Sequence, residues 1–309
     1  MLMGLKTVEW LYKLCMIAMA CLLGTACNEE DAAKDSVAAL QVAVQMQSVD
    51  GRALVTGDAL PDGSSIGVGV EGTDGWIIYD GTEQKNVGFI AAGAGAGQTW
   101  SSADPVYLTG GANFTVYAYY PWQQAQDFDP TAIPVDVTVA QTDWLYATPA
   151  KNIDYSNPKA DLTMNHALTA VRLVLGAPTY QGNGSGSSLA VSSEGLATSA
   201  LLDTRDGSFS NLGGQGSAIG FGTFEIRQGK QVEKTLLAVP TGISAPLVFT
   251  AVVDGYTYRT TSENVRLEPG NIYTYTLQFN GKQLTIGTVS LMPFSASGDI
   301  SLDFTVTGE

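Results

Sequence analysis

The stretch LVFTAVVDGYTYRTT, residues 247–261, decides the fold class of this chain. Strand-like runs with a period of two lie on both sides of Asp254-Gly255, and this period is typical of a half-buried β-strand. An Asp-Gly pair between two such runs is a strong local signal for a tight hairpin, because these residues tolerate the backbone angles of the turn. The stretch therefore predicts two antiparallel strands joined by a two-residue turn.

The same alternation recurs from Val37 to Val306, and no amphipathic helical pattern of more than two turns interrupts it. Turn signals such as PDG, TDG and EPGN separate the runs. Many short strands with regular turns indicate sandwiches or barrels, so we predict an all-β protein with a purely antiparallel β-sandwich in each half. The predicted strands are 38–46, 65–70, 76–79, 113–120, 168–176, 235–240, 247–255, 256–261, 271–279 and 300–307.

Composition changes along the chain suggest where the two halves meet. The glycine-rich segments 91–98 and 181–188 carry little apolar surface and are expected to be exposed hairpin tips or loops. Segment 147–162 contains two prolines and lacks strand alternation. We place the domain boundary there, which gives an N-terminal sandwich domain at 51–158 and a C-terminal one at 159–309.

The first residues have the order of a secretory signal peptide. Two lysines come first, an apolar run follows over residues 14–26, and Cys27 comes next. This run is shorter than the roughly 20 apolar residues that span a bilayer. An acidic segment follows Cys27 at once, so we expect 1–26 to be removed and 27–50 to be a flexible tether.

Cys27 is the expected lipid anchor. The small pair Thr25-Ala26 before it resembles a lipobox, the signal for acylating the cysteine with palmitate-type chains and cleaving in front of it. The motif departs from the usual pattern at Gly24, where a large aliphatic residue is preferred. The alternatives are acylation at Cys21 or a secreted protein without lipid. Lipidation implies contact with the outer membrane through the acyl chains alone.

Charge and cysteine content exclude several classes of function. The formal net charge is −15, and a strongly acidic surface opposes nucleic acid and anionic lipid head groups. The three cysteines, Cys15, Cys21 and Cys27, all lie within the signal or at its end. The mature body therefore has neither a disulfide nor a thiol ligand other than the anchor, and its stability depends on its core.

The chain offers few residues for catalysis. The single histidine, His166, lies among apolar residues and is expected to be a hydrogen-bonded structural residue. The acidic stretches 203–207 and 127–129 lack the full ligand ladder of a calcium loop and are explained by turns. We predict no enzyme, no metal site and no cofactor. A hydrolase with paired carboxylates is an open alternative, because spacing does not identify such pairs.

Exposed aromatic residues would support a different function. Trp76, Trp100 and Trp122 could provide a carbohydrate-binding platform if they lay exposed in one concavity. In that alternative the chain is a non-polymerising surface lipoprotein that binds a glycan or a host protein. Burial of all three rings would argue against it.

The order of several motifs resembles that of the fimbrillin-like proteins, the Mfa-like type V pilins of anaerobic Gram-negative bacteria. The matching segments are GTAC, GRALVTGDALPDGSSIGVGV (51–70), FTVYAYYPW (114–122), TDWLYATP (142–149), LTMNHALTAVRLVL (162–175) and PGNIYTYTLQFNGKQLTI (269–286). Each motif alone is weak, but together they span nearly the whole mature chain. The resemblance implies two tandem transthyretin-like β-sandwiches and a role as a fimbrial subunit in cell adhesion.

The resemblance also implies how such a subunit would mature. A protease of the trypsin type would cut between Arg52 and Ala53 and release the preceding segment, and a strand from a neighbouring subunit would fill the groove. The partners would be other fimbrial subunits, with a surface ligand of the host or of another bacterium. The residues expected to form the removable and donated strands are Leu40, Val42, Val44 and Met46, and Ile300, Leu302, Phe304 and Val306.

Overall fold

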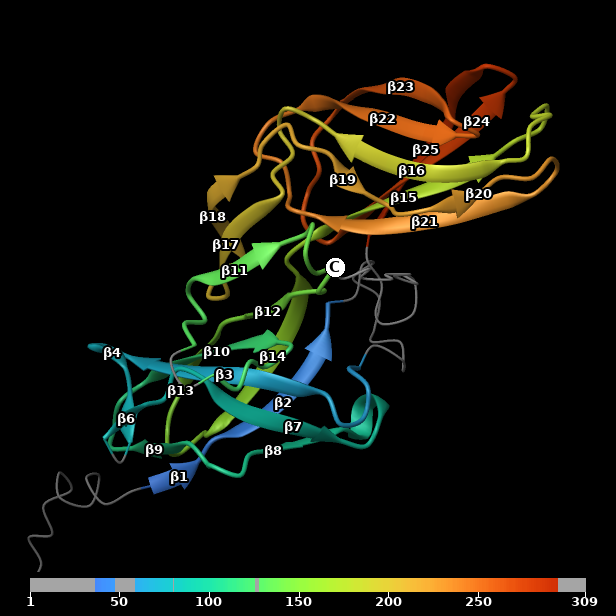
Figure 1. The fold of residues 1–309 in the computed structure, drawn as a ribbon. Coiled ribbons are helices and arrows are strands. Elements are labelled where there is room, and N and C mark those ends of the chain that lie inside the picture. The colour runs from blue at the N-terminus through green and yellow to red at the C-terminus, as the bar shows by residue number, and fades with distance from the viewer. Residues whose placement is uncertain (1–36, 48–58, 80, 126–127, 294–309) are drawn as a thin grey trace, which may run out of the picture.

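The computed structural model describes residues 37–47, 59–79, 81–125 and 128–293 of the 309-residue chain (Figure 1). The prediction of an all-β fold is confirmed: in this part of the chain the regular structure is β-strand apart from one short 3-10 helix, η1 (Gly95–Gly97). None of the described helices has the length and apolarity needed to cross a membrane.

The N-terminal half is built on a nine-stranded sheet that wraps around one apolar core. Its strands are β2 (Gln41–Met46), β14 (Lys159–His166), β12 (Leu145–Thr148), β10 (Phe114–Tyr120), β3 (Ser65–Gly72), β7 (Val87–Ala92) and β8 (Thr99–Ser101), in this spatial order, with β13 (Ala150–Ile153) on β10 and β4 (Gly75–Trp76) on β3. Two small sheets pair β1 (Val37–Ala39) with β9 (Tyr107–Thr109) and β5 (Ile78–Tyr79) with β6 (Thr82–Glu83). The end strands β2 and β8 contact each other, which closes the sheet around the core.

The C-terminal half is a sandwich of two sheets. One sheet has the order β21 (Gln231–Ala238), β15 (Thr169–Gly176), β24 (Asn271–Asn280) and β25 (Gln283–Pro293). The other has the order β19 (Ile219–Gly220), β16 (Ser185–Ser192), β22 (Ala245–Val253) and β23 (Tyr256–Val265), with β20 (Phe224–Glu225) also on β16. Rings from the two sheets meet in the core, where the centroids of Phe249 and Tyr275 are 4.9 Å apart.

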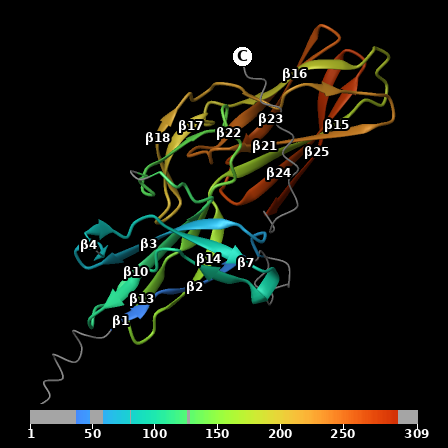
Figure 2. The same cartoon turned by 60° about the horizontal axis from the view of Figure 1, so that its bottom comes forward.

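A third, three-stranded sheet joins the halves. It contains β11 (Ile133–Asp136), β17 (Ser199–Asp203) and β18 (Ser208–Gly213). Strand β11 lies in the chain between two strands of the N-terminal sheet, yet Ile133 and Val135 are buried in the C-terminal core. In both views the two halves are separate lobes, with this sheet beside their junction (Figures 1 and 2). The halves are therefore interlocked and not simply consecutive.

The predicted hairpin at residues 254–255 is confirmed. Val253 pairs with Tyr256, so the turn contains only Asp254 and Gly255. Their φ angles are +51° and +81°, the left-handed values that a hairpin turn with two such residues requires. Local sequence chemistry is sufficient to specify this turn.

The prediction of purely antiparallel halves holds except at two pairs of strands. Strand β2 runs parallel to β14, and β15 runs parallel to β24. Alternation predicts which face of a strand is buried, but it carries no information about the direction of the neighbouring strand. A parallel partner has to come from a distant part of the chain, and that choice is made by the tertiary fold.

Segment 147–162 contains more strand than its sequence suggested. Strand β13 and the first half of β14 lie in it, and both pair within the N-terminal sheet. Ala160, Leu162 and Met164 are fully buried in the N-terminal core, whereas Ala167 lies in the C-terminal core. We therefore propose that the boundary between the halves lies near His166 rather than at residue 159.

Segment 181–188 differs from its prediction in the same way. It was expected to be an exposed loop, but strand β16 begins at Ser185 and Gly186 is buried against the ring of Phe224. The glycine provides room for that ring, so a glycine-rich composition here reflects close packing as well as a turn.

Alternating glycines on β3 separate two apolar layers. Ile66, Val68 and Val70 point into the N-terminal core and are fully buried. Gly67 and Gly69 face the other side, where the rings of Tyr119 and Trp76 lie directly on the backbone. Only a residue without a side chain leaves room for these rings, which explains the pattern SIGVGV.

Candidate functional site: the first strand of the N-terminal sheet

The segment 37–47 contains four of the predicted site residues and lies at one end of the N-terminal sheet. Its first part, β1, pairs with β9, and its second part, β2, pairs in parallel with β14. Backbone bonds continue between and beyond the strands: Leu40 N–H donates to Val106 O at 2.8 Å, and Gln47 N–H donates to Met164 O at 2.9 Å. The segment is therefore held as an added strand along two neighbouring elements.

Its side chains alternate between core and solvent. Leu40, Val42 and Met46 are buried in the N-terminal core, and Val44 is partly buried against it. Gln41 and Gln45 between them are exposed. Burying an aliphatic side chain contributes roughly 1.5–3 kcal/mol, so four of them hold the segment by an amount on the order of 8 kcal/mol before entropy costs. The four residues predicted for the removable strand thus lie together on one buried face.

Few polar interactions between side chains hold this segment to β14. Gln45 donates a 2.9 Å hydrogen bond to Thr163 Oγ1 at the exposed surface. The nearby ion pair between Lys159 and Asp161 is also exposed and lies within β14 itself. Exposed pairs of this kind contribute about 0–1 kcal/mol. Backbone bonds and alternate apolar side chains, the two features of strand addition, therefore account for most of the attachment.

Strand β25 is a second edge strand that the sequence reasoning did not predict. It pairs with β24 on one side and is last in its sheet. Val289, Leu291 and Met292 on it are exposed, at 55%, 58% and 48%. The signal that could have revealed this strand is Gly281, directly after the predicted strand 271–279: Asn280 pairs with Gln283, so the turn contains Gly281 and Lys282. Exposed apolar residues on a sheet edge are suited to contact with another strand.

Several predicted site residues lie outside the described part of the chain. These are the anchor Cys27, the maturation residues Arg52 and Ala53, and the donor-strand residues Ile300, Leu302, Phe304 and Val306. Their roles stay predictions. The described edge β25 ends at Pro293, so the predicted donor strand follows it along the chain.

The three predicted tryptophans do not form one exposed platform. Trp100 is buried in the N-terminal core. Trp76 is half-buried over Gly69 and makes an edge contact with Tyr117, with ring centroids 5.8 Å apart. Trp122 is half-buried and lies over Gly88. Each ring has a packing role on the sheet, as expected for aromatic residues beside glycines.

The described residues provide no obvious catalytic or metal site. His166 Nδ1 lies 2.9 Å from Asp143 Oδ1 in a partly buried pair, an arrangement that suits a structural residue. The described residues contain no group of three or more His, Cys, Asp or Glu arranged to hold a metal ion. Of residues 203–207, Asp203 ends β17 and 204–207 form the turn to β18, in which Gly207 has a φ of +75°.

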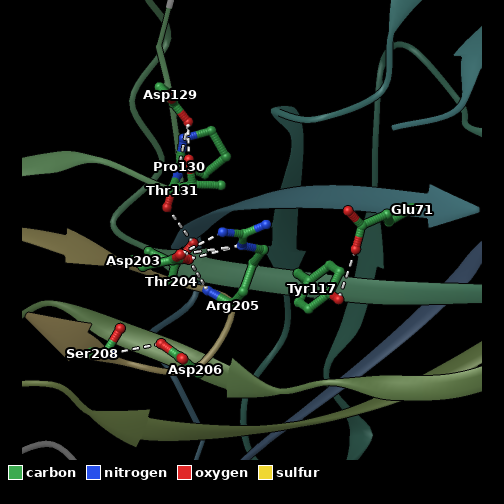
Figure 3. Close-up of polar contacts among 10 residues, drawn as sticks. All are labelled: Glu71, Tyr117, Asp129, Pro130, Thr131, Asp203, Thr204, Arg205, Asp206 and Ser208. Atoms are coloured by element: carbon green, nitrogen blue, oxygen red, sulfur yellow. Dashed lines mark hydrogen bonds and ion pairs between the residues drawn. The ribbon is translucent and has the colours of Figure 1, made fainter. Parts of the chain in front are cut away.

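That turn packs against the outer face of the N-terminal sheet and forms an interface between the two halves (Figure 3). The backbone of Gly207 lies directly against the ring of Tyr146 on β12. Thr204 is buried, and its hydroxyl donates a 2.7 Å hydrogen bond to Pro130 O. The Arg205 side chain lies between Asp203 and the hydrogen-bonded pair Glu71–Tyr117.

Neighbouring groups at this interface raise the pKa values of Arg205 and Tyr117. Two-point hydrogen bonding to Asp203 raises the pKa of Arg205, and the negative charge of Glu71 adds to this effect. Burial, followed by the hydrogen bond to Glu71, raises the pKa of Tyr117 to about 12. At neutral pH this interface therefore contains a charged guanidinium and a neutral phenol.

An Arg205→Gln variant is expected to lose about 1 kcal/mol of unfolding free energy, because Asp203 and Glu71 lose their shared cation. The loss should decrease at high salt, and urea denaturation at two ionic strengths would measure it. Arg227→Gln is the matched control: Arg227 also pairs with an acidic residue two positions earlier, Glu225, but both are well exposed. Equal losses in the two variants would contradict a role of Arg205 between the halves.

Comparisons with known proteins agree with this architecture. A family model described as fimbrillin-like matches residues 52–293. A proposed cell adhesion protein from Bacteroides uniformis is 19% identical, with a TM-score of 0.63 over 84% of this chain and 98% of that chain. Another from Bacteroides ovatus is 17% identical, with a TM-score of 0.62 over the same shares. None of the curated proteins matches the chain. At these identities the two solved structures show a shared fold.

Proposed function

The chain belongs to the fimbrillin-like family, and from this premise we propose that it is a structural and adhesive subunit of a cell-surface fimbria. In this role it associates with other fimbrial subunits and catalyses no reaction. The observation that carries the proposal is the arrangement of residues 37–47, an edge segment with one buried apolar face that precedes Arg52. A segment in that position can be exchanged without opening the rest of the sheet.

The proposed assembly step is strand exchange. Cleavage after Arg52 frees the segment that contains β2, and its departure leaves β14 as an unpaired edge. Ala160, Leu162 and Met164 of β14 would then flank an apolar groove that is fully covered in the intact chain. A strand from another subunit would restore both the main-chain hydrogen bonds and the alternate apolar contacts.

The proposed donor is the C-terminal segment with Ile300, Leu302, Phe304 and Val306, which has the same alternation as β2. Donation from the C-terminal half of one subunit to the N-terminal half of the next is a heterologous contact. Such contacts extend into a filament instead of closing. The exposed apolar residues of β25, which precede this segment, would be covered in the same contact.

The proposed route to the surface begins with the signal at 1–26 and lipidation of Cys27. The acyl chains hold the precursor in the outer membrane until the cut at Arg52 separates the body from the anchor. A subunit that keeps its anchor would instead stay at the base of a fimbria or act as a tethered monomer.

The test is the N-terminus and mass of the protein recovered from the surface of its own cells. We expect the native chain and Arg52→Lys to begin at Ala53 and to form high-mass ladders, because both provide a basic residue for the protease. Arg52→Ala should keep an acylated Cys27 and remain monomeric.

Lys34→Ala is the matched control, since it removes another basic residue of the same tether. It should mature normally. A native chain that begins at Asp35, or that stays acylated and monomeric in every variant, would overturn strand exchange and leave a tethered surface lipoprotein.

A further inference from the structure

A cleft of about 600 Å³ lies in the C-terminal half. The connections that line it are at the end of the sandwich farthest from the N-terminal half (Figure 1). Three connections meet there: the segment between β15 and β16, the β22–β23 turn and the β24–β25 turn. Its volume lies in the range of small-molecule sites. The residues that determine its chemistry are Tyr180, Tyr256, Tyr258, Gln181, Asn183 and Lys282.

Three tyrosines, Tyr180, Tyr256 and Tyr258, line the cleft. Tyr256 is 69% exposed, so the face of its ring is accessible to a ligand. Tyr258 and Tyr180 are buried by contrast, and Tyr258 is fixed by an edge contact with Phe279 at 5.3 Å. The cleft therefore has one exposed ring at its border and two immobilised rings at its base.

Hydrogen bonds hold the loop and the turn together. The Asp254 carboxylate accepts bonds from Tyr180 Oη at 2.7 Å and from the N–H groups of Gly184 and Ser185, each at 2.9 Å. The bond from Tyr180 is the main reason why the pKa of Asp254 is lowered, so the carboxylate is ionised at neutral pH. Gly182 lies so close to this pair that a Cβ there would overlap both partners. The site is thus preorganised before any ligand arrives.

The lining favours a neutral, hydroxyl-rich ligand. The exposed amides of Gln181 and Asn183 each offer donors and an acceptor, and Lys282 adds donors. The charge of Asp254 is already used within the protein, and the net charge of −15 disfavours anionic polymers. Flat rings together with planar amides match the apolar faces and the hydroxyl groups of a sugar. We propose that this cleft binds a neutral saccharide, with Tyr256 stacking on one sugar ring.

This inference deepens the proposed function, because it gives the adhesive subunit a class of ligand. It rests on the adhesive part of that proposal and is independent of strand exchange. The cleft is far from the β2–β14 edge, in the other half of the molecule (Figure 1). It also differs from the predicted tryptophan platform, since Trp76, Trp100 and Trp122 do not line it.

The test uses the uncleaved chain and saturation-transfer NMR with maltose, cellobiose, lactose, mannobiose and N-acetylglucosamine as probes, each at about 10 mM. We expect transfer to at least one probe. Tyr256→Ala should weaken it at least tenfold, whereas Tyr256→Trp should retain it because the stacking surface remains. Tyr79→Ala, which removes an exposed tyrosine of the N-terminal half, is the matched control and should bind normally.

Absence of transfer to all five probes would overturn the inference, as would equal binding by the native chain and Tyr256→Ala. The two proposals fail separately. Saccharide binding without high-mass ladders would remove the fimbrial assembly step alone. Ladders in a chain that binds none of the probes would remove the saccharide site alone.

Discussion

Alanine at Gly67 is expected to lower the free energy of unfolding by about 3 kcal/mol, a large change for a single methyl group. The added Cβ would overlap the ring of Tyr119, which is buried and donates a 2.6 Å hydrogen bond to Asn86 Oδ1. The ring is also stacked on Phe128 at 5.4 Å. Overpacking costs about 1–3 kcal/mol, and disturbing a buried hydrogen bond adds about 1–3 kcal/mol. Urea denaturation would measure the loss.

Gly111→Ala is the matched control, because a Cβ there has no heavy atom within 4 Å. It should change stability by less than about 0.5 kcal/mol. A double-mutant cycle with Tyr119→Ala gives a second check: once the ring is absent, alanine at Gly67 should cost little. Equal losses at Gly67 and Gly111, or additive losses in the cycle, would contradict the packing of Tyr119 on β3.

Val42→Asp is expected to detach the first strand from the sheet. Val42 is buried on β2, and a carboxylate there would be taken out of water without a partner. The loss should be limited to the docking of residues 37–47, since an edge strand can open without unfolding its neighbours. We expect amide hydrogens at 41–47 to exchange about 100-fold faster, corresponding to about 2.7 kcal/mol. Hydrogen exchange on the uncleaved chain would measure this.

Gln41→Asp introduces the same charge one position away and is the matched control. Gln41 is exposed and lies opposite Lys159, so the new carboxylate stays in water near a cation. Exchange at 41–47 should change by no more than a few-fold. If both variants opened the segment equally, the alternate burial of β2 would not be what holds it, and its role as an exchangeable strand would lose its physical basis.

The faces of the strands could be predicted because they depend on local periodicity. Val42, Val116 and Leu173 all point into a core, as their alternating neighbours indicated. The strands in segment 147–162 were not predicted. Polar residues and prolines dominate this segment, so the alternating positions of Ala160 and Leu162 were not recognised as part of a strand. The contribution of β11 to the C-terminal core had no local signal, since pairing of β11 with β17 joins residues far apart in the sequence.

The candidate sites were also predictable only in part from the sequence. The sequence indicated which side chains of β2 are apolar and which glycines lie in turns. The sequence did not indicate which aromatic side chains are exposed: Trp100 is buried, whereas Tyr256 at the end of a hairpin is exposed. Exposure depends on which loops converge around a ring, and that is a property of the whole fold.

The sequence by itself determined the all-β class, the Asp254-Gly255 hairpin and the buried face of strands such as β2, β10 and β15, because periodicity and turn chemistry act between residues close together in the chain. The tertiary structure alone decided that β2 lies parallel to β14, that the halves interlock through β11, and that three connections form a tyrosine-lined cleft. These features depend on contacts between segments that are far apart in the chain. The fold with the best total packing and hydrogen bonding determines which segments meet, and local periodicity contains no information about that choice.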